Sequence, residues 1–155
     1  MNLIQFTQSL PSHWATAPIY KKGVLLPKRN KNDPDKFAEG KSPLGKASYR
    51  DFSPATTALY LEENESDFAA CGVYTGTRSG GLVIFDVDSN LGAVKMKWGK
   101  DLEKTCVVTS PKKNAAKYLF IVPEELRLKV SGIDLSVYGE GWEVLWGMQV
   151  FSKSF

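Results

Sequence analysis

The stretch LVIFDVD, residues 82–88, constrains the fold more than any other part of the chain. Its unbroken apolar half is typical of a strand that is buried on both faces. Asp86 and Asp88 follow at alternate positions, so both carboxylates are expected on one face while Val87 points into the core. We therefore predict a buried strand that ends in two acidic residues, with Cα atoms about 6.5 to 7 Å apart.

Two carboxylates held on one rigid strand can converge on hard divalent cations such as Mg²⁺ or Mn²⁺, which take oxygen ligands. Such a pair serves nucleotidyl transfer, in which two metal ions stabilise the attacking and leaving oxygens. The alternative is a pair of acids at an exposed strand end, because a bare Asp-x-Asp pattern is common by chance. The position after an apolar strand favours the metal, since like charges there repel each other unless a cation or solvent intervenes.

The remaining apolar and glycine patterns predict an α+β domain with a mixed β-sheet core and flanking helices. Ser53 before Pro54 is a helix start, because the hydroxyl accepts a free N–H and proline needs none at the first helical position. The last three segments have the character of a meander with glycine at each turn. The expected helices cover 54–63 and 89–100, and the expected strands cover 14–20, 69–76, 82–88, 105–110, 117–123, 131–139, 141–147 and 148–154.

Length and composition indicate one globular domain over residues 1–155, because 43% of the residues are apolar. No apolar run approaches the length of a membrane span, and the N-terminus lacks the features of a signal peptide, which predicts a cytoplasmic protein without a membrane partner. Cys71 and Cys106 have neither zinc-site nor disulfide spacing, so we expect both to be small core residues.

Positive charge gathers in one segment, although the net charge is only +3. Residues 21–50 contain nine Lys or Arg against three Asp or Glu. A segment of this kind suits a polyanion such as nucleic acid, and the alternative is a solvated loop.

Five segments follow one another in an order that has a family counterpart: SHWATAPIY, GKSPLGK, VYTGTRSGGLVIFDVD, SPKKNAAKYLFIVP and WEVLWGMQV. The series resembles the N-terminal primase-polymerase (prim-pol) domain of phage and plasmid replication proteins, a branch of the archaeo-eukaryotic primases. The resemblance implies an RRM-like catalytic core and a DNA primase or polymerase that transfers nucleotides on a template. It also implies a bacterial cell, with the protein encoded by a phage or plasmid.

The resemblance further implies a set of site residues. Asp86, Asp88 and Glu143 would hold two Mg²⁺ or Mn²⁺ ions, with Asp134 as the alternative third carboxylate. DNA template and primer would meet the basic segment, including Lys41 and Lys46. The residues expected around the phosphates of a nucleoside triphosphate are Arg78, Ser79, Ser110, Lys112 and Lys117.

Two features depart from the family pattern. Lys117 stands where the family has a histidine that contacts the incoming nucleotide's phosphates; lysine still binds phosphate, but as a point charge. The chain also ends at VFSKSF, where the family continues with a helicase or helical module, which implies a shortened C-terminus and a helicase or other replication protein as partner. An alternative is therefore a catalytically impaired relative that binds nucleotide, DNA or a replication partner.

A second alternative comes from the same strand. LVIFDVD also resembles the nucleophile strand of haloacid-dehalogenase-type phosphatases, in which the first aspartate attacks phosphate. That family continues with Gly and Thr, where this chain has Ser89 and Asn90, and it needs a sizeable α/β domain.

Overall fold

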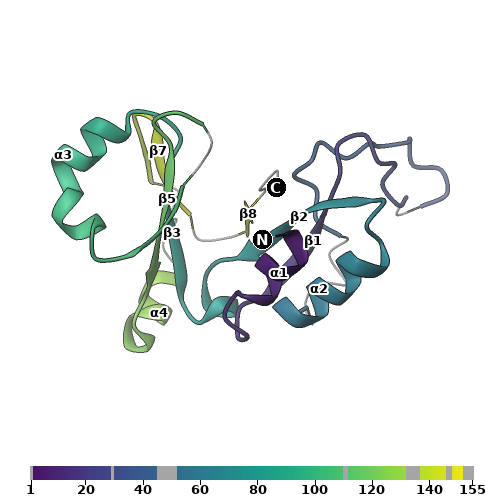
Figure 1. The fold of residues 1–155 in the computed structure, drawn as a ribbon, viewed down its shortest axis with the longest axis horizontal. Coiled ribbons are helices and arrows are strands. Elements are labelled where there is room, and N and C mark those ends of the chain that lie inside the picture. Colours follow the sequence, from purple (N-terminus) through teal and green to yellow (C-terminus); the bar gives the residue numbers. More distant parts are fainter. Residues whose placement is uncertain are drawn as a thin grey trace. The chain divides into compact units, whose positions relative to one another are not determined.

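The computed structural model describes residues 2–28, 30–44, 52–109, 112–131, 137–145 and 148–151. They form two small antiparallel sheets and a few helices, which confirms the predicted α+β class (Figure 1). Contacts divide the chain into two compact units: unit 1 is residues 1–74 with 149–155, and unit 2 is residues 75–148. Among the described residues, no helix has the length and apolar character needed to cross a membrane.

Unit 1 is built on a small sheet with strand order β1-β2-β8, in which β1 and β2 are antiparallel. Helix α2 begins as predicted, because the Ser53 hydroxyl accepts the N–H of Thr56 at 3.2 Å and proline occupies the first turn. The predicted helix over 54–63 is thus confirmed. The elements are α1 (Leu3–Gln8), β1 (Thr16–Tyr20), α2 (Pro54–Glu63), β2 (Phe68–Tyr74) and β8 (Met148–Phe151).

Strand β8 is not part of the predicted C-terminal meander. The segment 148–154 was predicted to pair with the strand before it in sequence, but β8 lies next to β2 in the smaller sheet. Alternating apolar residues identify a strand without identifying its neighbour, and consecutive strands are neighbours only about two-thirds of the time.

Unit 2 is a five-stranded sheet with strand order β4-β5-β3-β7-β6. Each of its pairings is antiparallel over the described residues, so this sheet is not mixed in direction. The strand that carries the two aspartates lies at its centre. The elements are a 3₁₀ turn η2 (Thr77–Ser79), β3 (Leu82–Val87), α3 (Leu91–Leu102), β4 (Cys106–Thr109), β5 (Ala116–Ile121), α4 (Glu124–Ser131), β6 (Val137–Gly139) and β7 (Trp142–Leu145).

Helix α3 packs on one face of β3. Phe85 and Val87 lie in a core cluster with residues of α3, and the Trp98 ring meets the Phe85 ring at 5.6 Å between centroids. Leu82 and Ile84, at alternate positions, are also fully buried. The predicted strand with two buried faces is therefore confirmed, and its even-numbered residues point away from α3.

Helix α4 is the main element that the sequence patterns did not predict. It occupies Glu124–Ser131, so the strand predicted over 131–139 is reduced to β6, and residues 132–136 lie outside the described residues. The signals of a helix were nevertheless present: Pro123 precedes two acidic residues in the first turn, and Lys129 lies in the last turn.

The prediction that both cysteines are core residues is confirmed for Cys71 and wrong for Cys106. Cys71 is fully buried in β2, and burial raises the pKa of its thiol to about 12. Cys106 is exposed, because β4 is an edge strand. The apolar pattern of TCVVTS marks a strand but does not show that both of its sides are covered.

Candidate metal centre

The end of β3 places two carboxylates at different depths. Asp86 lies within the strand and has a side chain only 8% exposed, whereas Asp88 lies just beyond the strand end and is 64% exposed. Val87, between them, is buried in the cluster with α3. The alternation predicted from LVIFDVD thus places the two acids on the face opposite α3, at the end of a strand whose earlier residues on that face, Leu82 and Ile84, are apolar.

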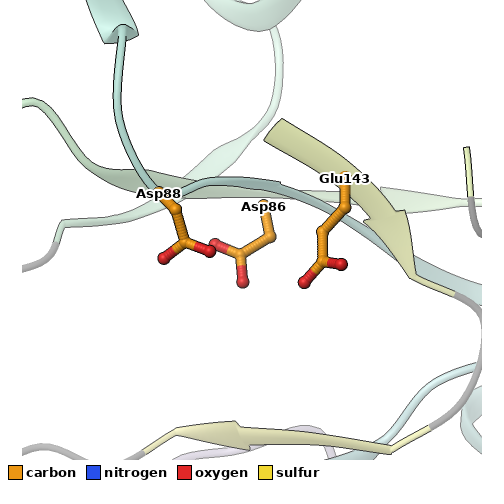
Figure 2. A group of neighbouring side chains, drawn as sticks. All are labelled: Asp86, Asp88 and Glu143. Atoms are coloured by element: carbon orange, nitrogen blue, oxygen red, sulfur yellow. The ribbon is translucent and has the colours of Figure 1, made fainter. Parts of the chain in front are cut away.

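Strand β7 adds a third carboxylate. Glu143 is in register with Asp86 across the antiparallel β3–β7 pair, and the three acidic side chains gather on one side of the sheet (Figure 2). One carboxylate oxygen from each of Asp86, Asp88 and Glu143 lies within 4.8 Å of the other two. Of the two candidates for the third carboxylate, the structure thus brings Glu143 to the pair, while Asp134 lies outside the described residues.

This cluster has a donor set that can hold a divalent metal ion. Carboxylate oxygens are the ligands that Mg²⁺ and Mn²⁺ prefer. Two unit charges about 5 Å apart repel each other by roughly 3 kcal/mol at an effective dielectric constant of about 20. Three such groups repel one another, so positive charge close by stabilises the cluster.

The turn between β6 and β7 fixes the backbone at Asp88. The Gly141 carbonyl accepts the N–H of Asp88 at 2.9 Å and that of Ser89 at 3.1 Å. Gly141 has a φ of +78°, and a Cβ on it would lie 2.3 Å from the Ser89 Oγ. The sequence predicts a turn glycine here but not this role, since only the pairing of β7 with β3 brings the turn to Asp88.

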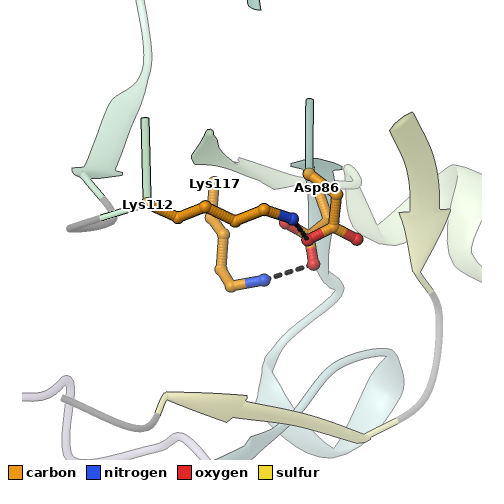
Figure 3. A network of polar contacts seen from close by, with 4 residues as sticks. Asp86, Lys112 and Lys117 are labelled. Atoms are coloured by element: carbon orange, nitrogen blue, oxygen red, sulfur yellow. Dashed lines mark hydrogen bonds and ion pairs between the residues drawn. The ribbon is translucent and has the colours of Figure 1, made fainter. Parts of the chain in front are cut away.

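Two lysines supply positive charge next to the acids (Figure 3). Lys117 is in register with Asp86 on the other side of β3, so Lys117, Asp86 and Glu143 form one row across three strands. The Lys117 ammonium donates to Asp86 Oδ2, and the Lys112 Nζ lies 3.7 Å from Asp88 Oδ1. Lys117 therefore faces the acidic centre directly.

Arg78 and Ser79 lie at the other end of β3. Both are in η2, before the strand begins at Leu82, and four residues at about 3.3 Å each separate Leu82 from Asp86. Arg78 is exposed and Ser79 is fully buried. Their contact with nucleotide phosphates stays a prediction.

The other predicted site residues are not joined to the centre by the structure. Lys41 is exposed and belongs to unit 1. Ser110 and Lys46 lie outside the described residues. Their contacts with nucleotide or DNA also stay predictions.

Comparison of the chain with protein-family models, with curated proteins and with solved structures gives no match.

Proposed function

We propose that this chain is a DNA primase-polymerase module that joins nucleotides on a template strand with two divalent metal ions. The observation that carries the proposal is the in-register meeting of Glu143 with Asp86, next to Asp88. Three carboxylates from two strands on one side of a sheet suit two-metal nucleotidyl transfer. If the Asp-x-Asp pair had arisen by chance, a third carboxylate would not be expected beside it on a strand that is far away in sequence.

The topology of unit 2 supports the same proposal. Its elements follow in the order β3-α3-β4-β5-α4-β7, and the strands β4-β5-β3-β7 are neighbours in the sheet. This order resembles the split β-α-β arrangement of ferredoxin-like and RRM-like folds, with β6 as an additional edge strand. An RRM-like core is the fold that the prim-pol resemblance implies, although fold alone does not define function.

In the proposed reaction the 3′ hydroxyl of a primer loses its proton to solvent, and its oxygen attacks the α-phosphorus of a nucleoside triphosphate. The bond from that phosphorus to the bridging oxygen breaks, and pyrophosphate leaves with the electron pair. Bound Mg²⁺ or Mn²⁺ would stabilise the charge on the attacking and leaving oxygens. Asp86, Asp88 and Glu143 would hold the ions, while Lys112 and Lys117 would neutralise phosphate oxygens.

The charges of the centre indicate that metal and nucleotide enter together. Three carboxylates and two ammonium groups leave one formal negative charge. Two divalent ions alone would make the centre strongly positive, whereas a triphosphate brings about four negative charges that restore the balance. We expect Mn²⁺ to bind more tightly when a nucleoside triphosphate is present.

A primer-extension assay tests the proposal, with primed and unprimed templates, each class of nucleotide, and Mg²⁺ or Mn²⁺. We expect metal-dependent synthesis that Asp86→Ala or Glu143→Ala lowers at least a hundredfold. Asp101→Ala, which removes an exposed acid from α3, is the matched control and should retain activity. Absence of synthesis under all conditions, with Mn²⁺ binding unchanged in Asp86→Ala, would overturn the proposal.

A second candidate function is binding of nucleotide or DNA without catalysis. The observation in its favour is the Lys117–Asp86 ion pair, because a lysine bound to a metal ligand competes with the metal. Calorimetry with a nucleoside triphosphate and Mn²⁺, run beside the extension assay, separates the two. Binding without synthesis in the native chain, together with synthesis gained in Lys117→His, would favour the second candidate.

The phosphatase alternative has less support. The haloacid-dehalogenase-type proposal needs an α/β domain, which is built on parallel strands, whereas β3 has antiparallel neighbours on both sides. Release of phosphate with an aspartyl-phosphate on Asp86 would reverse this preference.

A further inference from the structure

The basic segment forms an arm on unit 1 rather than a structureless loop. Its two sides are joined by backbone hydrogen bonds of 2.8 Å from the N–H of Ala38 to the carbonyl of Val24 and from the N–H of Leu26 to the carbonyl of Lys36. Leu25 and Phe37 pair between these bonds as an antiparallel bridge. We call residues 23–38, as far as the structure describes them, the basic arm.

The two faces of the basic arm differ. Val24, Leu26 and Ala38 pack in the core cluster of unit 1, which anchors that face. Side chains alternate along extended backbone, so Leu25 and Phe37 point the other way and lie close together. Phe37 is 62% exposed and Leu25 is 52% exposed. An aromatic ring is thus held outward on an anchored support.

Lysines flank this exposed apolar pair in the sequence. Residues 21–41 contain seven Lys or Arg against three Asp or Glu. Lys28 forms an ion pair with Asp35 at 2.7 Å, which closes the arm near its tip. Lys22, Lys31 and Lys36 are exposed. The apolar pair therefore lies within a local excess of positive charge.

An exposed aromatic ring in a basic segment indicates which class of molecule the arm would bind. The cores of protein–protein interfaces are depleted in lysine, whereas surfaces that bind nucleic acid are strongly positive. An aromatic ring with basic neighbours is the arrangement on which single-stranded nucleic acids stack their bases. In a duplex the base faces are covered by one another, so a ring such as Phe37 gains no stacking there.

We propose that the basic arm is a binding site for single-stranded nucleic acid, in which Phe37 stacks on a base and the arm's lysines contact phosphates. The inference deepens the proposed function by naming a site for the unpaired template. It does not require metal, nucleotide or the carboxylates of unit 2, so binding and catalysis can be tested separately.

Fluorescence anisotropy with a labelled oligothymidylate of about twenty nucleotides in EDTA tests the site, using the whole chain. We expect Phe37→Ala to weaken binding about ten- to a hundredfold and Phe37→Trp to retain it. Leu59→Ala is the matched control, because Leu59 is an exposed apolar residue of unit 1 on α2, 59% exposed. Thermal unfolding should be nearly unchanged in all three variants, since both positions are mostly exposed.

Two further probes identify which parts of the strand the arm binds. On an abasic oligonucleotide, which keeps phosphates but lacks bases, Phe37→Ala should have no effect. Replacing Lys31 and Lys36 with Gln should reduce the slope of log affinity against log salt by about 0.7 for each phosphate that a lysine no longer neutralises.

Several results would overturn the inference. The first is equal binding of duplex and single strand, and the second is an unchanged affinity in Phe37→Ala. The third is a native chain that binds no DNA and whose oligomeric state changes in Phe37→Ala, which would indicate that the arm mediates self-association. The native chain must also bind the strand in EDTA, because the proposed site requires no metal. If extension is absent but strand binding depends on Phe37, the catalytic proposal fails while this inference stands.

Discussion

Two ion pairs at the acidic centre have the same chemistry and different surroundings. Lys117 and Asp86 are 23% and 8% exposed, whereas Lys112 and Asp88 are 61% and 64% exposed. A charge taken out of water is costly unless it keeps its partner, while an exposed pair is screened and contributes little. Position along one strand end therefore decides which ion pair contributes to folding stability and which is mostly exposed to solvent.

Removing the buried pair's lysine should have the largest effect on stability. Lys117→Met leaves Asp86 buried without its ammonium partner, and we expect a loss of about 2 to 3 kcal/mol in the free energy of unfolding, allowing for the exposed part of Lys117. Denaturant unfolding measures this loss. The double variant with Asp86→Asn removes both charges and should recover most of it.

A divalent ion should replace the missing lysine in Lys117→Met. Because the ammonium no longer competes for Asp86, Mn²⁺ should stabilise this variant more than the native chain, in proportion to the logarithm of metal concentration over dissociation constant. Equal stabilisation of both by Mn²⁺ would mean that the buried aspartate is not a metal ligand.

The hydrogen bonds from Asp88 and Ser89 to the Gly141 carbonyl predict an intermediate effect on stability. Gly141→Ala adds a Cβ at positive φ and 2.3 Å from the Ser89 Oγ, so we expect a loss of about 1 to 3 kcal/mol and weaker Mn²⁺ binding. Gly23→Ala is the control, because its φ is +88° but a Cβ there meets nothing within 4 Å. The control should lose some stability and keep its Mn²⁺ affinity; loss of metal affinity in both would place the cause in general destabilisation.

The sequence predicted the acidic side of β3 better than its surroundings. Alternation in LVIFDVD identified a buried strand with two acids, and the Ser53–Pro54 pair located α2, because both signals are local. The row of Lys117, Asp86 and Glu143 depends on which strands become neighbours of β3, and no local pattern contains that information. Glu143 as third carboxylate came from the family resemblance.

The dependence of strand pairing on residues far apart in sequence also explains two predictions that were wrong. MQVF was identified as a strand but assigned to the wrong sheet, since its partner β2 lies far away in sequence. Exposure of Cys106 follows from the edge position of β4, which is also set by the whole sheet. Helix α4 is different, because its sequence signals are local. The charges at its two ends are typical of a helix, but eight residues are too few to show a clear helical periodicity.

The exposed pair should give the smallest effect on stability. Lys112→Met removes an ammonium 3.7 Å from Asp88, and we expect a change within about 0.5 kcal/mol that shrinks further at high salt. Under the proposed function the same lysine faces phosphates, so the KM for the nucleotide should rise severalfold at low salt while unfolding is unaffected. A stability loss as large as that of Lys117→Met would contradict the division between the two pairs, because it would require the Lys112–Asp88 pair to be shielded from water. A KM independent of both Lys112 and salt would instead remove this lysine from the nucleotide site and leave Lys117 as the lysine that acts there.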